Sequence, residues 1–157
     1  MRSSSIHEIK QELVTLNAGD VTTLCLRLAR FKKENKELLT YLLFEAKDEE
    51  NYIKNIKQEI KELFAEINLS HLYFAKKTLR KILRVINKHS RYSGNKQTDM
   101  ELRIFFCQQL KASGIPFRQN AVLSNIFDGQ LKKINAALTT LHEDLQHDYK
   151  KDISALA

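Results

Sequence analysis

Apolar side chains recur at intervals of three and four residues along most of the chain, which is the period of an amphipathic α-helix. The first predicted helix begins with a capping box formed by Ser5 and Glu8, and a second helix follows the stop at Gly19. A third segment, over about 38–44, is apolar on nearly all sides, so we expect it to be packed between neighbouring helices. A fourth helix is predicted over about 48–67.

The second half of the chain continues the same pattern. A fifth helix is expected from Ser70, and an exposed loop over about 90–97 separates it from a sixth. A seventh begins near Phe117, and Gly129 divides it from a long eighth helix that carries a narrow apolar seam. No segment alternates with period two. The predicted fold class is therefore all-α: seven or eight helices as antiparallel hairpins, forming a helical bundle or a short HEAT-like solenoid.

Length and composition favour one folded domain over residues 1–157. Hydrophobic residues make up 43% of the chain, enough for a core, and a single Pro with four Gly leaves few breaks between helices. Past about residue 146, Tyr149, Ile153 and Leu156 extend the apolar seam. The seam either packs on the chain's own core, or its distal part projects beyond the domain and joins two copies as a homodimer.

Positive charge is concentrated on one predicted helix. The chain has 26 Lys and Arg against 19 Asp and Glu, yet residues 70–97 include eight basic side chains and no acid. On a helical wheel, five of the basic residues lie opposite the apolar arc. Tyr73 and Tyr92 bracket this row and are placed to stack on bases. The row consists of Lys77, Lys81, Arg84, Lys88 and Arg91.

Three interpretations of the basic row remain open. It is a solvated structural face, a surface that follows the phosphates of a nucleic acid, or a site for an acidic protein. In the first case, acids of the preceding helix neutralise basic residues in the row and on its flank. The expected pairs are Glu66 with Lys76, Glu62 with Arg80, and Glu59 with Arg84.

The sequence offers little for catalysis. It has no glycine-rich phosphate loop, and His142 and His147 lie five residues apart, on different sides of a helix. We therefore expect no enzymatic activity, no cofactor and no metal site. A helix-turn-helix around Gly19 would place Arg27 and Arg30 in a DNA groove, but the basic row lies about fifty residues away.

Two cysteines, Cys25 and Cys107, lie far apart within apolar helical stretches. We expect both to be buried thiols in a reducing compartment. The chain also lacks any stretch that approaches a membrane span. The expected location is the cytoplasm, without membrane association.

Several short motifs resemble those of an uncharacterised bacterial all-helical family. They are Ile9-Lys10-Gln11-Glu12-Leu13, then Leu16 and Asp20, then Asn35-Lys36-Glu37-Leu38-Leu39, then Ala75-Lys76-Lys77. The resemblance covers about residues 6–90, and in outline the hairpins are similar to HEAT-type repeats. It implies an all-helical fold and carries neither an activity nor a site.

Together these features predict a non-enzymatic helical scaffold or macromolecular binding module. The alternative is a nucleic-acid-associated protein that uses the basic row of the fifth helix and the loop after it.

Overall fold

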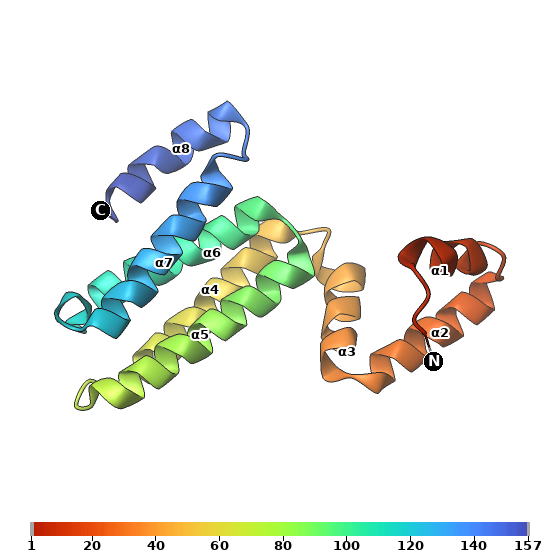
Figure 1. The fold of residues 1–157 in the computed structure, drawn as a ribbon, viewed down its shortest axis with the longest axis horizontal. Coiled ribbons are helices and arrows are strands. Elements are labelled where there is room, and N and C mark those ends of the chain that lie inside the picture. The colour runs from red at the N-terminus through yellow and green to blue at the C-terminus, as the bar shows by residue number, and fades with distance from the viewer. Residues whose placement is uncertain (1, 157) are drawn as a thin grey trace. The chain divides into compact units, whose positions relative to one another are not determined.

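The computed structural model describes residues 2–156, which are helical almost throughout and include no strand (Figure 1). The predicted all-α class is thus confirmed. A π-helical turn, Tyr41–Glu45, follows α3, and a 3₁₀ turn, Phe117–Gln119, precedes α7. The eight α-helices of the described residues are α1 (Ile6–Leu13), α2 (Ala18–Phe31), α3 (Lys33–Thr40), α4 (Glu49–Ala65), α5 (Leu72–Ser93), α6 (Lys96–Ala112), α7 (Ala121–Leu138) and α8 (Glu143–Ser154).

The backbone forms two compact units, residues 1–44 and residues 45–157. The sequence analysis predicted a single domain and did not anticipate this division. Among the described residues, the buried hydrophobic side chains belong to the second unit, with the exception of Tyr41. The hydrophobic core therefore lies in the unit that contains α4 to α8. None of the helices described here is long and apolar enough to span a bilayer.

In the first unit, α2 and α3 pack against each other. The predicted capping box of α1 is confirmed, because the Glu8 backbone N–H donates to Ser5 Oγ at 3.2 Å and Glu8 accepts from the Ser5 backbone N–H at 2.6 Å. The predicted burial of 38–44 is wrong. Only Tyr41 is buried there, and Leu42, Leu43 and Phe44, which follow it in the π-helical turn, are exposed.

The second unit is organised around α6, which packs against α4, α5 and α7. Eight of its residues are buried and cover most of its circumference, so α6 comes nearest to the enclosed helix that the sequence had suggested for 38–44. Met100, Phe106 and Leu110 are fully enclosed, and the Phe106 ring lies 5.6 Å from that of Phe64 on α4.

A buried arginine on α6 joins three helices. Arg103 is 5% exposed, and its guanidinium forms two contacts with Asp99 of the same helix, at 2.9 Å to Oδ2 and 2.7 Å to Oδ1. It also donates to Asn87 of α5 at 2.8 Å and to Gln130 of α7 at 2.6 Å. Burial raises the pKa of Asp99, but the hydrogen bond and charge of Arg103 outweigh it, so the net pKa lies below the ordinary value.

The turn between α5 and α6 is short, and the exposed loop predicted over 90–97 is wrong. α5 continues to Ser93, and Gly94 ends it in the left-handed conformation, at φ 66°. Asn95 then caps α6. Glu49 of α4 holds this turn, because its carboxylate accepts hydrogen bonds from Thr98 at 2.6 Å and from Ser93.

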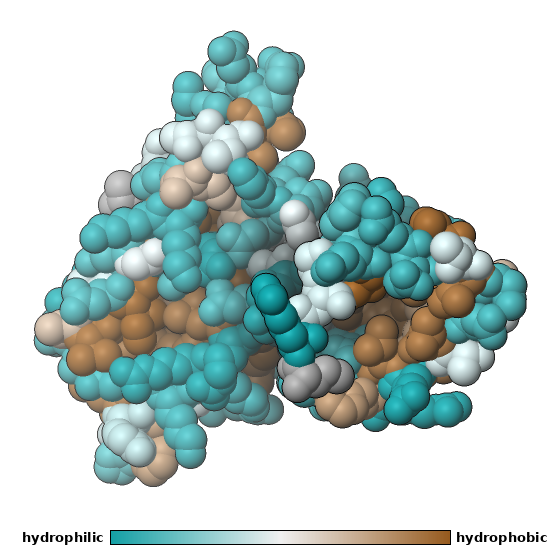
Figure 2. Space-filling model, turned by 45° about the vertical axis from the view of Figure 1, so that its right-hand side comes forward, coloured by the Kyte–Doolittle hydropathy of each residue, from teal (hydrophilic) through white to brown (hydrophobic). Residues whose placement is uncertain are grey.

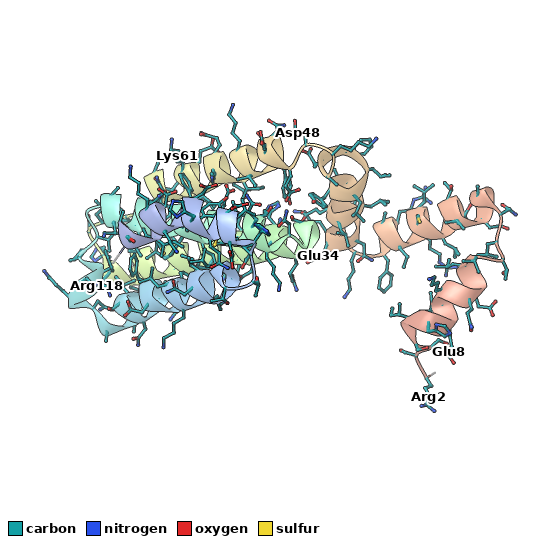
Figure 3. The ribbon with its side chains drawn as sticks, turned by 90° about the horizontal axis from the view of Figure 1, so that it is seen from above. Arg2, Glu8, Glu34, Asp48, Lys61 and Arg118 are labelled. Carbon is teal, nitrogen blue, oxygen red and sulfur yellow. The ribbon has the colours of Figure 1, made fainter. Side chains whose placement is uncertain are left out.

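The C-terminal region also differs from the prediction of one long helix after Gly129. α7 runs through Gly129, and the chain reverses over residues 139–142 before α8. In Figure 1, α8 returns alongside α7 and α6, and the labelled Arg118 in Figure 3 marks the opposite turn, between α6 and α7.

α8 is held by hydrogen bonds to α6. The Tyr149 hydroxyl donates to Glu101 and accepts from Gln97 at 2.9 Å, and Lys111 donates to the backbone carbonyl of Ala155 at 2.9 Å. Leu156 is buried. The residues past about 146 therefore pack on their own unit and do not project, which removes the basis for the predicted homodimer through this helix.

The two cysteines differ. Cys107 is buried, and burial raises the pKa of its thiol to about 12, whereas Cys25 is only half-buried. The prediction of a buried thiol is confirmed for Cys107 and is wrong for Cys25.

We predict that the hydrogen bond between Tyr149 and Glu101 makes the free energy of unfolding decrease with pH in the alkaline range. Burial and the hydrogen bond to Glu101 raise the pKa of Tyr149 to about 12, above the value near ~10 of an unfolded chain. The contribution is thus fully present below about pH 10 and is lost as the pH rises towards 12. Tyr149→Phe should lower the free energy of unfolding by about 1 kcal/mol at neutral pH. Urea titrations should show this difference shrinking above about pH 10, and a difference that stays constant to pH 12 would contradict the assignment.

We predict that Arg103→Met strongly destabilises the second unit, because three polar partners of the buried guanidinium would lose it and Asp99 would stay half-buried without its counter-charge. The expected loss is about 3–5 kcal/mol in urea unfolding followed by circular dichroism. Arg80→Met is the matched control, since Arg80 is exposed on α5, and should change stability by less than about 0.5 kcal/mol. Equal losses in the two variants would show that the Arg103 contacts are dispensable.

Candidate functional site

The basic row predicted on the fifth helix is exposed along α5. We call Lys77, Lys81, Arg84, Lys88 and Arg91 the basic ridge. Four of its side chains are exposed, and that of Lys88 is half-buried. The opposite side of the helix is enclosed, with Leu79, Ile82 and Ile86 fully buried. Because α5 rises 1.5 Å per residue, the ridge is about 21 Å long.

The burial of the apolar arc follows the prediction with two exceptions. Leu79 and Ile86 are fully enclosed as expected, while Leu83 is half-buried. Leu72 is 38% exposed, because it is the first residue of the helix. In its central turns, α5 therefore buries the side that the sequence predicted.

The ion pairs expected between α4 and α5 are absent from the described residues. Glu59 instead lies 3.8 Å from Nε2 of His89, and Glu62 accepts a hydrogen bond from Gln58 of its own helix at 3.0 Å. Within residues 2–156, no ion pair neutralises the exposed basic side chains on this side of α5. These are Lys77, Arg80, Lys81, Arg84 and Arg91.

Aromatic side chains gather at the N-terminal end of the ridge. Tyr73 is 72% exposed, and its ring lies 5.4 Å from that of Phe74, which in turn lies 6.0 Å from the His71 ring. The prediction that Tyr92 brackets the other end is wrong. Tyr92 is 9% exposed and packs edge-on against His89, so its ring faces cannot stack on a ligand.

A hollow of about 430 Å³ lies at the C-terminal end of the ridge. Three exposed cations from three helices line it: Arg91 of α5, Lys96 of α6 and Lys133 of α7. Asp99 also lines the hollow, but its carboxylate forms an ion pair with the guanidinium of Arg103. The hollow extends the positive surface beyond α5, and the charge of Lys133 contributes to the lowered pKa of Asp99.

Sequence reasoning missed part of this surface. Lys133 lies far from the ridge in sequence, and only the packing of α7 on α6 brings it close. Phe74 and Lys96 were within reach of the sequence analysis, since Phe74 follows Tyr73 and Lys96 belongs to the same acid-free segment. Their closeness to the ridge in the sequence could have identified them.

The described residues offer no metal site, since no group of three or more His, Cys, Asp or Glu lies close enough together to hold an ion. His89 lies between α4 and α5, with Nδ1 2.7 Å from the hydroxyl of buried Tyr52 and Nε2 near Glu59. These contacts join two helices that pack along their length.

No protein-family model, curated protein or solved structure matches this chain. The similarity to HEAT-type hairpins therefore stays a prediction, and the basic ridge is interpreted from its own geometry.

We predict that the ridge contributes little to stability. Lys81→Glu should change the free energy of unfolding by less than about 0.5 kcal/mol, because this side chain is exposed and forms no ion pair with the described residues. Leu79→Ala, two residues away on the enclosed side, should cost about 2–5 kcal/mol. Thermal and urea unfolding measure both, and a large loss in Lys81→Glu would assign the ridge a structural role.

Proposed function

We propose that this protein is a non-enzymatic helical binding module, and that its basic ridge binds the backbone of single-stranded nucleic acid. The observation that carries the proposal is that no carboxylate of the described residues neutralises the exposed cations of the ridge. They are Lys77, Lys81, Arg84 and Arg91. Like charges one helical turn apart repel one another by a few tenths of a kcal/mol per pair. An anionic ligand would relieve this repulsion.

The spacing of the ridge suits a polymer. Its cations follow one another at intervals of four, three, four and three residues, so they form one line along the helix. A line of positive charge about 21 Å long can contact several consecutive phosphates. The hollow at its end, with Lys96 and Lys133, offers two further cations for the same strand.

The exposed aromatic rings favour a single strand over a duplex. Tyr73 and Phe74 are both accessible at the start of α5. An unpaired base can stack on such a ring, and this stacking contributes roughly 1–3 kcal/mol per base. A paired base inside a duplex has no free face for it. An acidic protein would use the cations but gain less from the rings.

We predict binding of a fluorescent oligothymidylate, measured by anisotropy over a range of salt concentrations. Each phosphate contact on a single strand lowers the slope of log affinity against log salt by ~0.7, so four contacts give roughly −3. The double variant Lys81→Glu/Arg84→Glu should lose nearly all binding. Its matched control is Lys132→Glu/Lys150→Glu, which reverses two exposed cations that belong neither to the ridge nor to the lining of the hollow, and it should retain binding.

A second variant tests the stacking. Tyr73→Ala should weaken binding of the single strand by about 5- to 100-fold. Binding of a duplex of the same length should change little. No binding at low salt, or an equal loss in the control variant, would contradict the proposal. Competition by polyglutamate as strong as that by the oligonucleotide would identify an acidic protein as the better ligand class.

A further inference from the structure

The hollow at the C-terminal end of the basic ridge differs from the ridge in how its charges are arranged. The ridge is a row along one helix, whereas the hollow is lined by Arg91 of α5, Lys96 of α6 and Lys133 of α7. All three side chains are exposed, and none forms an ion pair with the described residues. Three cations on different helices therefore surround one space.

The other two charged groups of the hollow neutralise each other. The Asp99 carboxylate lies 2.7 Å from the guanidinium of Arg103, and its pKa is lowered, so the pair is ionised at neutral pH. Lys133 contributes to the lowered pKa through its charge but forms no ion pair with Asp99. The hollow thus keeps a strong excess of positive charge for an anionic ligand.

The fold holds these cations in place before any ligand binds. Gly94, at φ 66°, lines the hollow and allows α6 to begin directly after α5, so Arg91 and Lys96 are close although they belong to two helices. Lys133 is positioned by the packing of α7 on α6, and Arg103 links all three helices through Asn87 and Gln130. A site on a rigid framework loses less entropy when it binds.

A cluster of three cations suits a phosphate monoester better than a phosphate diester. A monoester carries about −1.5 to −2 charge at neutral pH and has three oxygens that accept hydrogen bonds. A diester inside a strand carries a single negative charge, which one cation of the ridge can neutralise. The volume of the hollow, about 430 Å³, lies within the ~300–1,000 Å³ of small-molecule sites, so a phosphate and its sugar fit.

We propose that the hollow binds the terminal phosphate monoester of a single strand that lies along the basic ridge. The inference rests on the proposed function, because the ridge must hold the strand for its end to reach the hollow. Arg91 belongs to both surfaces, so the strand passes from one to the other without a gap. The phosphorylated end would lie at the turn between α5 and α6, and the rest of the strand would run towards Tyr73.

Competition against a fluorescent oligothymidylate tests the proposal in the full chain. Three unlabelled strands of equal length are compared: one with hydroxyl groups at both ends, one with a 5′-phosphate and one with a 3′-phosphate. At least one phosphorylated strand should bind about 5- to 30-fold more tightly than the unphosphorylated strand at low salt. The strand that gains more identifies the direction in which it lies on the ridge.

A fourth strand separates recognition of the monoester from added charge. It has no terminal phosphate and is two nucleotides longer, so its two extra diesters supply about the charge of one monoester. It should gain no more than about twofold in affinity, because the ridge is already covered by the shorter strand. A gain as large as that of the phosphorylated strand would show that the hollow does not recognise a strand end.

A pair of variants assigns the preference to the hollow. Lys96→Gln/Lys133→Gln leaves every residue of the ridge in place and should abolish the preference for a phosphorylated end. Its binding of the unphosphorylated strand should fall by no more than about threefold. The matched control, Lys132→Gln/Lys150→Gln, neutralises two exposed cations outside the hollow and should keep the preference. Circular dichroism should be unchanged in both variants.

The outcomes distinguish this inference from the proposed function. Equal affinity for all three strands of equal length would overturn the inference while ridge binding remains. A preference that survives in Lys96→Gln/Lys133→Gln, or one that the control variant also loses, would overturn it as well. Failure of every strand to bind the unaltered protein at low salt would overturn the proposed function and the inference together.

Discussion

The second unit depends on how the buried guanidinium of Arg103 is satisfied. An unpaired charge in this position would be strongly destabilising, so three helices must bring their polar groups to it. Asp99, Asn87 and Gln130 do so from α6, α5 and α7. The contact with Asn87 links α5 to this group, and the buried apolar arc of α5 sets the rotation of the helix. That rotation turns the basic ridge to the surface and its apolar arc towards α6.

Local sequence patterns predicted the helices and the orientation of α5, because a period near 3.6 separates its buried side from its charged side. Such patterns could not predict contacts between residues that lie far apart in the sequence. The burial of Tyr92 depends on His89 and the close packing of α4, and the short turn at Gly94 depends on Glu49 of α4. The chain reversal before α8 carries only a weak local signal, since the apolar seam continues through it.

The two units illustrate opposite uses of amphipathic helices. In the second unit, apolar sides face one another around α6, and the charged side of α5 remains at the surface. In the first unit, apolar side chains of all three helices are exposed, and hydrophobic side chains are visible on this unit in Figure 2.

The central claim is that α5 carries the ligand surface, and amide chemical-shift mapping by NMR tests it most directly. On addition of oligothymidylate, the largest shifts should fall on residues 73–96 and around Lys133, at the ridge and the adjacent hollow. The amides of α8, which faces α6 through Tyr149, should change little. Shifts concentrated on α8 or within residues 1–44, with α5 unaffected, would contradict the claim.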